Sequence, residues 1–397
     1  MKRKLYRPRR SVFRQRRVHP VIKVFGTLLI CVAVIAAGFF SAMFISKHSQ
    51  DNPHKAVGGS APHSSNDKPG GGDSQQPAGD VEAPDAPKDP IDTPASLDTI
   101  RAFHLSFDAL KADSLPSTLS AARKAGFTAV TFDLKDADGK LYYLFSNAQA
   151  KKVGYADGAL SADTLTALMN SMKEHGLAPI PRLYAFCDDP AAKVLTDARI
   201  SHTANHTWAW YDGDPNNGGK KWLNPYAPAA QDYITSLAKE LKDKGAAAIL
   251  LDGVQFPAQL KDAYLGEEAA TVTKDAALTA FVTRVRSELG SDCPLILACT
   301  AKGALATDTK IYGGNPVTFG ATVISPLLSS KVQESVEKTV LRLQGPDITS
   351  TSLAPLLQAQ GFSAKQVNEA IAACVKGGAK SFILVADDYD FASYTLP

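Results

Sequence analysis

The sequence predicts an α/β protein: a TIM (β/α)8 barrel preceded by a single transmembrane helix and a disordered linker. Three observations lead to this prediction. An uncharged apolar run lies near the N-terminus, a stretch rich in Pro, Gly and Ser follows it, and apolar runs alternate with amphipathic segments from about residue 99 onward. The 397 residues leave room for a barrel, which typically needs about 250 residues.

The N-terminal segment is predicted to cross a membrane once. The run from Val24 to Ile45 has no charged residue, and a helix of that length spans roughly 33 Å, the thickness of a bilayer's hydrocarbon core. Residues 1–47 hold eleven Lys and Arg and no acidic residue. Because basic flanks resist translocation, we expect a cytoplasmic tail over residues 1–20 and a bilayer-spanning helix over residues 21–46. The C-terminal domain is then extracellular.

Two alternatives compete for this segment. A cleaved signal peptide has an apolar region of about 7 to 15 residues and a small-x-small site, which Ser41-Ala42-Met43 fits poorly. A nucleic-acid-binding arm would also be basic, but the adjacent apolar run already accounts for the charge, so we expect no nucleic-acid partner. Residues 47–98 are rich in Pro, Gly, Ser, Asp and Ala, cannot form a core, and are predicted to be a disordered linker.

Residues 99–397 are predicted to form the barrel, because repeated βα units are typical of a parallel sheet covered by helices. The eight candidate strands are Ala102 to Phe107, Ala129 to Leu134, Ala178 to Phe186, Ala247 to Asp252, Leu295 to Cys299, Ala321 to Ser325, Val340 to Gln344 and Ser381 to Ala386. The candidate helices are Leu115 to Ala125, Ala162 to His175, Ala227 to Lys244, Asp275 to Leu289, Val332 to Thr339 and Ala364 to Lys376. Eight such units favour a barrel over a doubly wound sheet.

Carboxylates follow several of the predicted strands, at the barrel end where TIM-barrel active sites lie. Paired carboxylates are what glycosidic cleavage requires, one as an acid and one as a nucleophile or base. A loop Asp can equally cap a helix or bind backbone N–H groups. Asp252 stands out because it ends an apolar run, where a charge is costly unless it faces a polar pocket. The candidates are Asp133 and Asp136 after the second strand, Asp188 after the third, Asp252, and Asp387 after the eighth, with Arg182 inside the third strand.

All three tryptophans, Trp208, Trp210 and Trp222, lie in the segment between the third and fourth predicted strands. Their flat apolar faces could stack on sugar rings, or they could fasten a long loop to the barrel rim. We expect no metal and no cofactor. His202 and His206 lack the acidic partner of an H-E-x-x-H motif, and Asp138-Gly139 is more typical of a tight turn than of a calcium loop.

Several motifs follow one another along the barrel region: Phe132-Asp133-Leu134-Lys135-Asp136 with Asp138-Gly139, Pro181-Arg182 through Cys187-Asp188, Trp222-Leu223-Asn224-Pro225-Tyr226, Asp252-Gly253-Val254-Gln255-Phe256-Pro257, Ile324-Ser325-Pro326 and Gln344. In these motifs and their order, the chain resembles a bacterial family of glycosyl-hydrolase-like TIM barrels over roughly Ile100 to Tyr394. The chain departs from the family where Thr300 and Thr322 stand in place of Asp and Gln255 in place of Arg.

The resemblance implies a polysaccharide or cell-wall glycan as ligand. Combined with the strand-end carboxylates, it predicts a membrane-anchored extracellular glycoside-hydrolase-like protein that uses Asp252 with Asp133 or Asp387 as catalytic residues. The predicted substrate-binding residues are Asp136, Arg182, Asp188, Trp208, Trp210, Trp222, Gln255 and Gln344. The alternative is a catalytically degenerate barrel that binds cell-wall glycan through the tryptophan loop.

Overall fold

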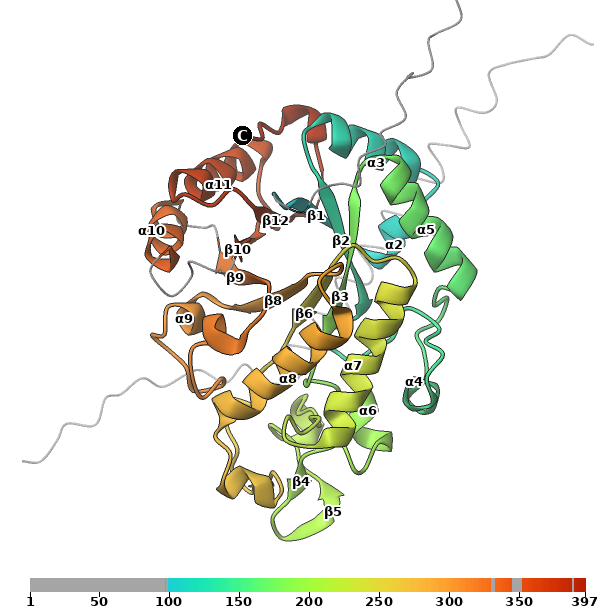
Figure 1. Ribbon diagram of the computed structural model, residues 1–397, viewed down its shortest axis with the longest axis vertical. Coiled ribbons are helices and arrows are strands. Elements are labelled where there is room, and N and C mark those ends of the chain that lie inside the picture. The colour runs from blue at the N-terminus through green and yellow to red at the C-terminus, as the bar shows by residue number, and fades with distance from the viewer. Residues whose placement is uncertain (1–96, 98, 330–332, 345–351, 388) are drawn as a thin grey trace, which may run out of the picture. The chain divides into compact units, whose positions relative to one another are not determined.

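The computed structural model describes residue 97 and residues 99–329, 333–344, 352–387 and 389–397. Within these ranges, eight parallel strands follow one another around a closed barrel, and β12 pairs back with β1 (Figure 1). The strands are β1 (Arg101–Leu105), β2 (Ala129–Lys135), β3 (Ala178–Tyr184), β6 (Ile249–Asp252), β8 (Leu295–Thr300), β9 (Val323–Ser329), β11 (Leu356–Gln358) and β12 (Phe382–Val385). The predicted TIM barrel is therefore confirmed.

Long helices surround the strands, and all six lie where the sequence pattern predicts a helix (Figure 1). They are α3 (Leu115–Lys124), α5 (Ala162–Glu174), α7 (Pro228–Asp243), α8 (Lys274–Leu289), α10 (Gln333–Leu343) and α11 (Ala364–Lys376). Shorter helices occupy the loops: α2 (Phe107–Leu110), α4 (Ala148–Val153), α6 (Asp189–Val194), α9 (Ala301–Ala304), η1 (Pro215–Asn217), η2 (Glu267–Ala270), η3 (Pro316–Phe319) and η5 (Phe391–Ser393).

The seventh strand is the one that the sequence pattern misplaces. The segment from Val340 to Gln344 is not a strand, because its first four residues form the last turn of α10. Val336, Val340 and Leu343 are buried at helical spacing, which the short apolar run conceals. The seventh barrel strand is β11, which pairs with β9. The two-residue strand β10 (Ser352–Leu353), which precedes β11 in the chain, pairs with the start of β9.

Below the C-terminal mouth, the side chains inside the barrel are apolar and either small or branched. Ala102, Ala129, Ile180 and Leu250 belong to this inner cluster, which is separate from the larger core between the strands and the helices. Successive residues of a strand point to opposite faces, so every second residue of each strand faces the barrel axis. The next inward positions, two residues further along, lie at the C-terminal mouth.

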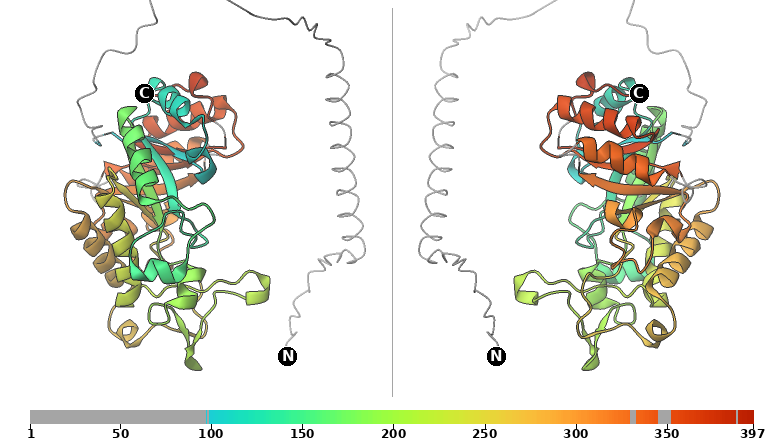
Figure 2. Two further views of the ribbon diagram at one scale, coloured as in Figure 1. Left: turned by 90° about the vertical axis from the view of Figure 1, so that its right-hand side faces the viewer. Right: turned by 90° about the vertical axis from the view of Figure 1, so that its left-hand side faces the viewer.

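A small antiparallel sheet extends the same end of the barrel. It contains β4 (Ser201–His202), β5 (Asn205–Ala209) and β7 (Ala263–Tyr264), in the order β5-β4-β7. These strands come from the loops after β3 and β6, and the β4–β5 hairpin projects away from the barrel (Figures 1 and 2).

The predicted basic tail, transmembrane helix and most of the linker lie outside the described residues. In the part of the chain that the structure describes, none of the helices combines the length and apolar character needed to cross a bilayer.

Candidate functional site

Polar side chains replace the apolar inner cluster at the C-terminal mouth of the barrel. Each lies two residues beyond an inward-facing barrel residue, so strand alternation points it to the axis. Register brings them together, because Asp133 pairs with Arg182 across β2 and β3, and Tyr184 pairs with Asp252 across β3 and β6. The central cluster consists of His104, Asp133, Arg182, Tyr184 and Asp252.

Arg182 binds Asp133 through two parallel hydrogen bonds. Its Nε atom donates to Oδ1 at 2.5 Å and its Nη2 atom donates to Oδ2 at 2.9 Å. Bidentate guanidinium–carboxylate pairs are among the strongest hydrogen-bonded contacts in proteins, and they favour an ionised carboxylate. Asp133 is therefore held in a fixed orientation by Arg182.

Asp252 occupies a different environment from Asp133. Its Oδ2 atom lies 3.9 Å from Nη1 of Arg182, and its Oδ1 atom accepts a hydrogen bond of 2.7 Å from the Gly253 N–H. Tyr184 is the residue that pairs with Asp252 across β3 and β6. Burial raises the pKa of Asp252 above its ordinary value, and Arg182, the Gly253 N–H and the nearby Tyr184 offset only part of this effect. One guanidinium thus lies between a carboxylate that it binds directly and a carboxylate whose pKa is raised by burial.

His104 closes the cluster on the β1 side. Its Nε2 atom lies 3.6 Å from Oδ2 of Asp133, and its Nδ1 atom shares a hydrogen bond of 3.1 Å with the Thr131 hydroxyl. Burial and the nearby Arg182 lower the pKa of His104 to about 4, although Asp133 acts in the opposite direction. The imidazole is therefore neutral at pH 7 and able to donate one hydrogen bond.

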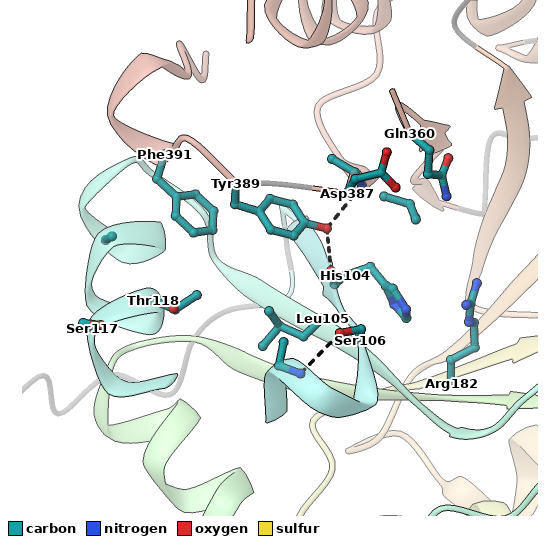
Figure 3. A pocket seen from close by; sticks show the side chains of 14 residues that line it. His104, Leu105, Ser106, Ser117, Thr118, Arg182, Gln360, Asp387, Tyr389 and Phe391 are labelled. Carbon is teal, nitrogen blue, oxygen red and sulfur yellow. Dashed lines mark hydrogen bonds between the residues drawn. The ribbon is translucent and has the colours of Figure 1, made fainter. Parts of the chain in front are cut away.

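A pocket of about 720 Å³ opens beside this cluster. His104 and Arg182 form its inner end, Ser117 and Thr118 of α3 its outer end, and Asp387 lines it from the segment after β12 (Figure 3). Its volume lies within the range of small-molecule sites, and its hydroxyl, amide and aromatic lining suits a polyhydroxylated ligand. The other labelled lining residues are Leu105, Ser106, Gln360, Tyr389 and Phe391 (Figure 3).

The three predicted catalytic residues therefore occupy two places. Asp133 and Asp252 face each other across Arg182 in the central cluster. Asp387 is exposed at the pocket wall, where its Oδ2 atom accepts a hydrogen bond of 2.7 Å from the Gly361 N–H. Gln255 is half-buried just after β6.

Two of the predicted ligand-binding carboxylates are engaged by the protein itself. Asp136 accepts hydrogen bonds from the N–H groups of Asp138 and Lys140, each at 2.9 Å, and one of 2.8 Å from the Tyr142 hydroxyl. Asp188 is fully buried and caps α6 by accepting from the Ala191 N–H at 2.9 Å. These contacts favour structural roles for both.

The tryptophans also divide into two groups. Trp208 is 59% exposed on the projecting hairpin, whereas Trp210 and Trp222 are only 4% and 6% exposed. The Nε1 atom of Trp210 donates to the Lys261 carbonyl at 2.7 Å, and that of Trp222 donates to Asp212 at 2.8 Å. The buried Trp210 and Trp222 therefore fit the role of fastening the loop to the barrel rim. Trp208 has an exposed ring, which fits stacking on a sugar.

Gln344 lies far from the other candidates along the barrel axis. It directly follows α10, which returns toward the N-terminal ends of the strands, and its Nε2 atom donates to the Gly377 carbonyl at 2.6 Å after α11. TIM-barrel active sites lie at the opposite end. A structural role between two helix ends is therefore favoured.

Three residues of the site, His104, Tyr184 and Tyr389, were not predicted from the sequence. For His104, the alternation Ile100, Ala102, His104 along the first strand would have indicated an inward-facing residue at the mouth. Tyr389 is more difficult to find, since its hydroxyl donates to the His104 carbonyl from 285 residues away. Thr300, at the end of β8, caps α9 by accepting from the Gly303 N–H at 3.0 Å.

Within the described residues, no group of three or more His, Cys, Asp or Glu side chains is arranged to hold a metal ion. The four cysteines in this part of the chain, Cys187, Cys293, Cys299 and Cys374, are free thiols.

Closed-barrel topology and a cluster of carboxylates at the C-terminal mouth define a glycoside-hydrolase-like TIM barrel. Residues 102–310, more than half of the chain, match the family described as "putative glycosyl hydrolase domain". The chain belongs to this family. No curated protein matches the sequence.

Three of the solved structures to which this chain is similar have low sequence identity to it. A hypothetical protein from Ruminiclostridium thermocellum is 20% identical, with a TM-score of 0.42 over 49% of this chain and 96% of that one. The glycoside hydrolase domain of PelA from Pseudomonas aeruginosa is 13% identical, with a TM-score of 0.43 over 72% and 94%. A GH20 exo-β-N-acetylglucosaminidase from Vibrio harveyi is 9% identical, with a TM-score of 0.46, and this chain, aligned over 74% of its length, spans 50% of that enzyme.

Proposed function

We propose that this protein is a membrane-anchored extracellular glycoside hydrolase that cleaves a polysaccharide or cell-wall glycan with two carboxylates. The observation that supports this most is the arrangement of Asp133 and Asp252 on either side of Arg182 at the barrel mouth. Family membership supports a carbohydrate substrate, and the pocket beside the cluster offers the space for one.

The two carboxylates differ in the way that glycosidic cleavage requires. Asp252 has a raised pKa and is the general acid, which gives its proton to the leaving glycosidic oxygen. Asp133, which Arg182 binds through two hydrogen bonds, stabilises the positive charge that develops on the sugar and acts as nucleophile or base. His104 is neutral and donates a hydrogen bond to a sugar hydroxyl or to Asp133.

A catalytically inactive glycan-binding barrel is the second candidate. Thr300, where the resembling family has a carboxylate, caps α9 and transfers no proton. Trp208 supports this candidate too, because an exposed ring on a projecting hairpin can stack on a sugar of an insoluble glycan.

One screen separates the two candidates. The purified full-length chain is incubated with a panel of neutral, acidic and amino-sugar polysaccharides, and both binding and new reducing ends are measured. If the protein is a hydrolase, reducing ends should appear, and Asp252→Asn should lower their rate at least about a hundredfold while binding persists. Binding that is equal in wild type and Asp252→Asn, with no cleavage by either, would establish the binding module.

The membrane topology has its own test. Protease added to intact cells should release the C-terminal domain by cutting within residues 48–98 and leave the basic tail protected. A C-terminal domain that resists external protease, but is cut after the cells are permeabilised, would place it in the cytoplasm.

A further inference from the structure

A fully buried ion pair lies next to the central cluster. The Lys135 Nζ atom is 3.0 Å from Oδ2 of Asp188, and both side chains are completely inaccessible to solvent. Removing two charges from water is costly, and such a pair is weak evidence for a purely stabilising role. Neither side chain lines the pocket beside the central cluster, so the pair calls for another explanation.

Lys135 also holds the backbone at the end of β3. In addition to its ion pair with Asp188, its ammonium donates to the Tyr184 carbonyl at 2.5 Å and to the Ala185 carbonyl at 3.3 Å. The β2–β3 register shifts between Asp133, which pairs with Arg182, and Lys135, which pairs with Leu183. The side chain of Lys135 therefore holds β3 at the point where the strand register is irregular.

The same stretch of backbone reaches Asp252 on its other side. The Ala185 N–H belongs to the peptide whose carbonyl Lys135 binds, and it donates to the Asp252 carbonyl at 2.8 Å. Tyr184, whose carbonyl belongs to that peptide, pairs with Asp252 across β3 and β6. A single peptide plane thus connects the buried ammonium to the proposed acid.

Asp188 fixes the other end of this arrangement. Its Oδ1 atom caps α6, and Gly139 of the turn after β2 packs so closely that a Cβ atom there would lie 2.3 Å from the same oxygen. The motif segments after β2 and β3 therefore meet at one carboxylate. Asp188 has no freedom to move without moving both segments.

We propose that Lys135 and Asp188 are positioning residues for the candidate active site: the pair holds the Tyr184–Ala185 peptide and thereby fixes the end of β3 against Asp252. This inference rests on the proposed function for its catalytic meaning. The structural part of the inference, that the buried pair affects the surroundings of Asp252, does not depend on whether the protein cleaves a glycan.

The test uses variants of the full chain. Lys135→Met alone leaves Asp188 as an uncompensated buried charge and is expected to unfold easily. The double variant Lys135→Met/Asp188→Leu removes both charges together, so it restores an apolar interior and leaves the net charge near Asp252 unchanged. Lys221→Met is the matched control. It breaks the neighbouring Lys221–Asp189 pair, whose atoms are 3.1 Å apart, without touching the Tyr184 or Ala185 carbonyls.

Two measurements report on the coupling without requiring cleavage. The Asp252 carboxyl is titrated by carbon-13 NMR, with Asp252→Asn for assignment, and hydrogen exchange of the Ala185 amide is followed. In the folded double variant, the end of β3 is no longer held against Asp252, so the pKa of Asp252 should shift by about one unit and the Ala185 amide should exchange at least about tenfold faster. Lys221→Met should leave both values unchanged.

The outcomes are distinct. A double variant that folds with the wild-type Asp252 titration and Ala185 exchange would overturn the inference and leave a purely structural pair. If the wild type cleaves no glycan but the two readouts change as expected, the proposed function fails and the positioning role stands.

Discussion

Arg182 places two of its guanidinium nitrogens on the two oxygens of Asp133, at 2.5 and 2.9 Å, and its third nitrogen 3.9 Å from Asp252. Among the described residues that line the pocket, this is the one permanently charged base, and Asp133 already neutralises it. With Asp387 at the pocket wall and Asp252 beside its inner end, the binding region is neutral to negative. The charge on a ligand should consequently decide how well it binds.

Neutral glycans should bind better than acidic ones. A uronic-acid oligosaccharide brings carboxylates into a pocket lined by Asp387, and Arg182 has no free pair of donors to offer because Asp133 already accepts two of its hydrogen bonds. We expect at least about tenfold weaker binding than for a neutral oligosaccharide of the same length, because like charges at an interface cost several kcal/mol. Calorimetric titration measures the difference. Tighter binding of the acidic ligand would show that Arg182 leaves Asp133 on binding.

His104 should make the fold sensitive to acid. Its pKa is about 4 in the folded protein and about 6.5 when unfolded, so between these values the unfolded state binds more protons. Stability is therefore lost as the pH falls from 6.5, by about 3 kcal/mol at pH 4. Urea unfolding of wild type and His104→Asn at pH 7 and pH 4 isolates this contribution. Equal losses in the two proteins would contradict a buried neutral His104.

The barrel could be predicted from the sequence because its strands and helices are strongly periodic. The exception is the seventh strand, which is only three residues long, Leu356–Gln358, whereas the apolar run chosen upstream of it, Val340 to Gln344, contains the end of α10. A run as short as Val340 to Gln344 fits the period of a helix and the period of a strand equally well. Only the burial of Val336, Val340 and Leu343 at helical spacing shows that it belongs to a helix.

Only those site residues that stand out against the apolar sequence of a strand could be predicted. Asp252 ends an apolar strand, and Asp133 and Arg182 each interrupt one, so local pattern is enough to select them. Asp188 follows a strand in the same manner, yet Lys135, from the end of β2, holds it in the interior. Contacts between distant segments decide which loop carboxylates face a ligand, and one sequence does not contain that information.

Trp208 and Trp210 should respond differently to truncation. Trp208 is exposed, so Trp208→Ala should change the free energy of unfolding by less than about 0.5 kcal/mol but weaken glycan binding about three- to tenfold if its ring stacks on sugar. Trp210 is buried and hydrogen-bonded to the Lys261 carbonyl, so Trp210→Ala should cost about 3–5 kcal/mol. Urea unfolding and glycan titration on both variants test this division. Equal stability losses would contradict it.

Gly139 should tolerate a methyl group far less well than another glycine of similar backbone conformation. It has a φ of +82° and packs against Asp188, where a Cβ atom would lie 2.3 Å from Oδ1 and 2.9 Å from the Pro190 ring. Gly218 has a φ of +90°, and an added methyl group there would meet no atom within 4 Å, so Gly218→Ala should cost only the left-handed backbone term of about 1–2 kcal/mol. Gly139→Ala should cost about 1–3 kcal/mol more, because the buried Asp188 cannot retreat from Lys135. The difference in free energy of unfolding between the two variants measures the contact, and equal values would mean that the turn after β2 and the Asp188 carboxylate are not packed together in solution.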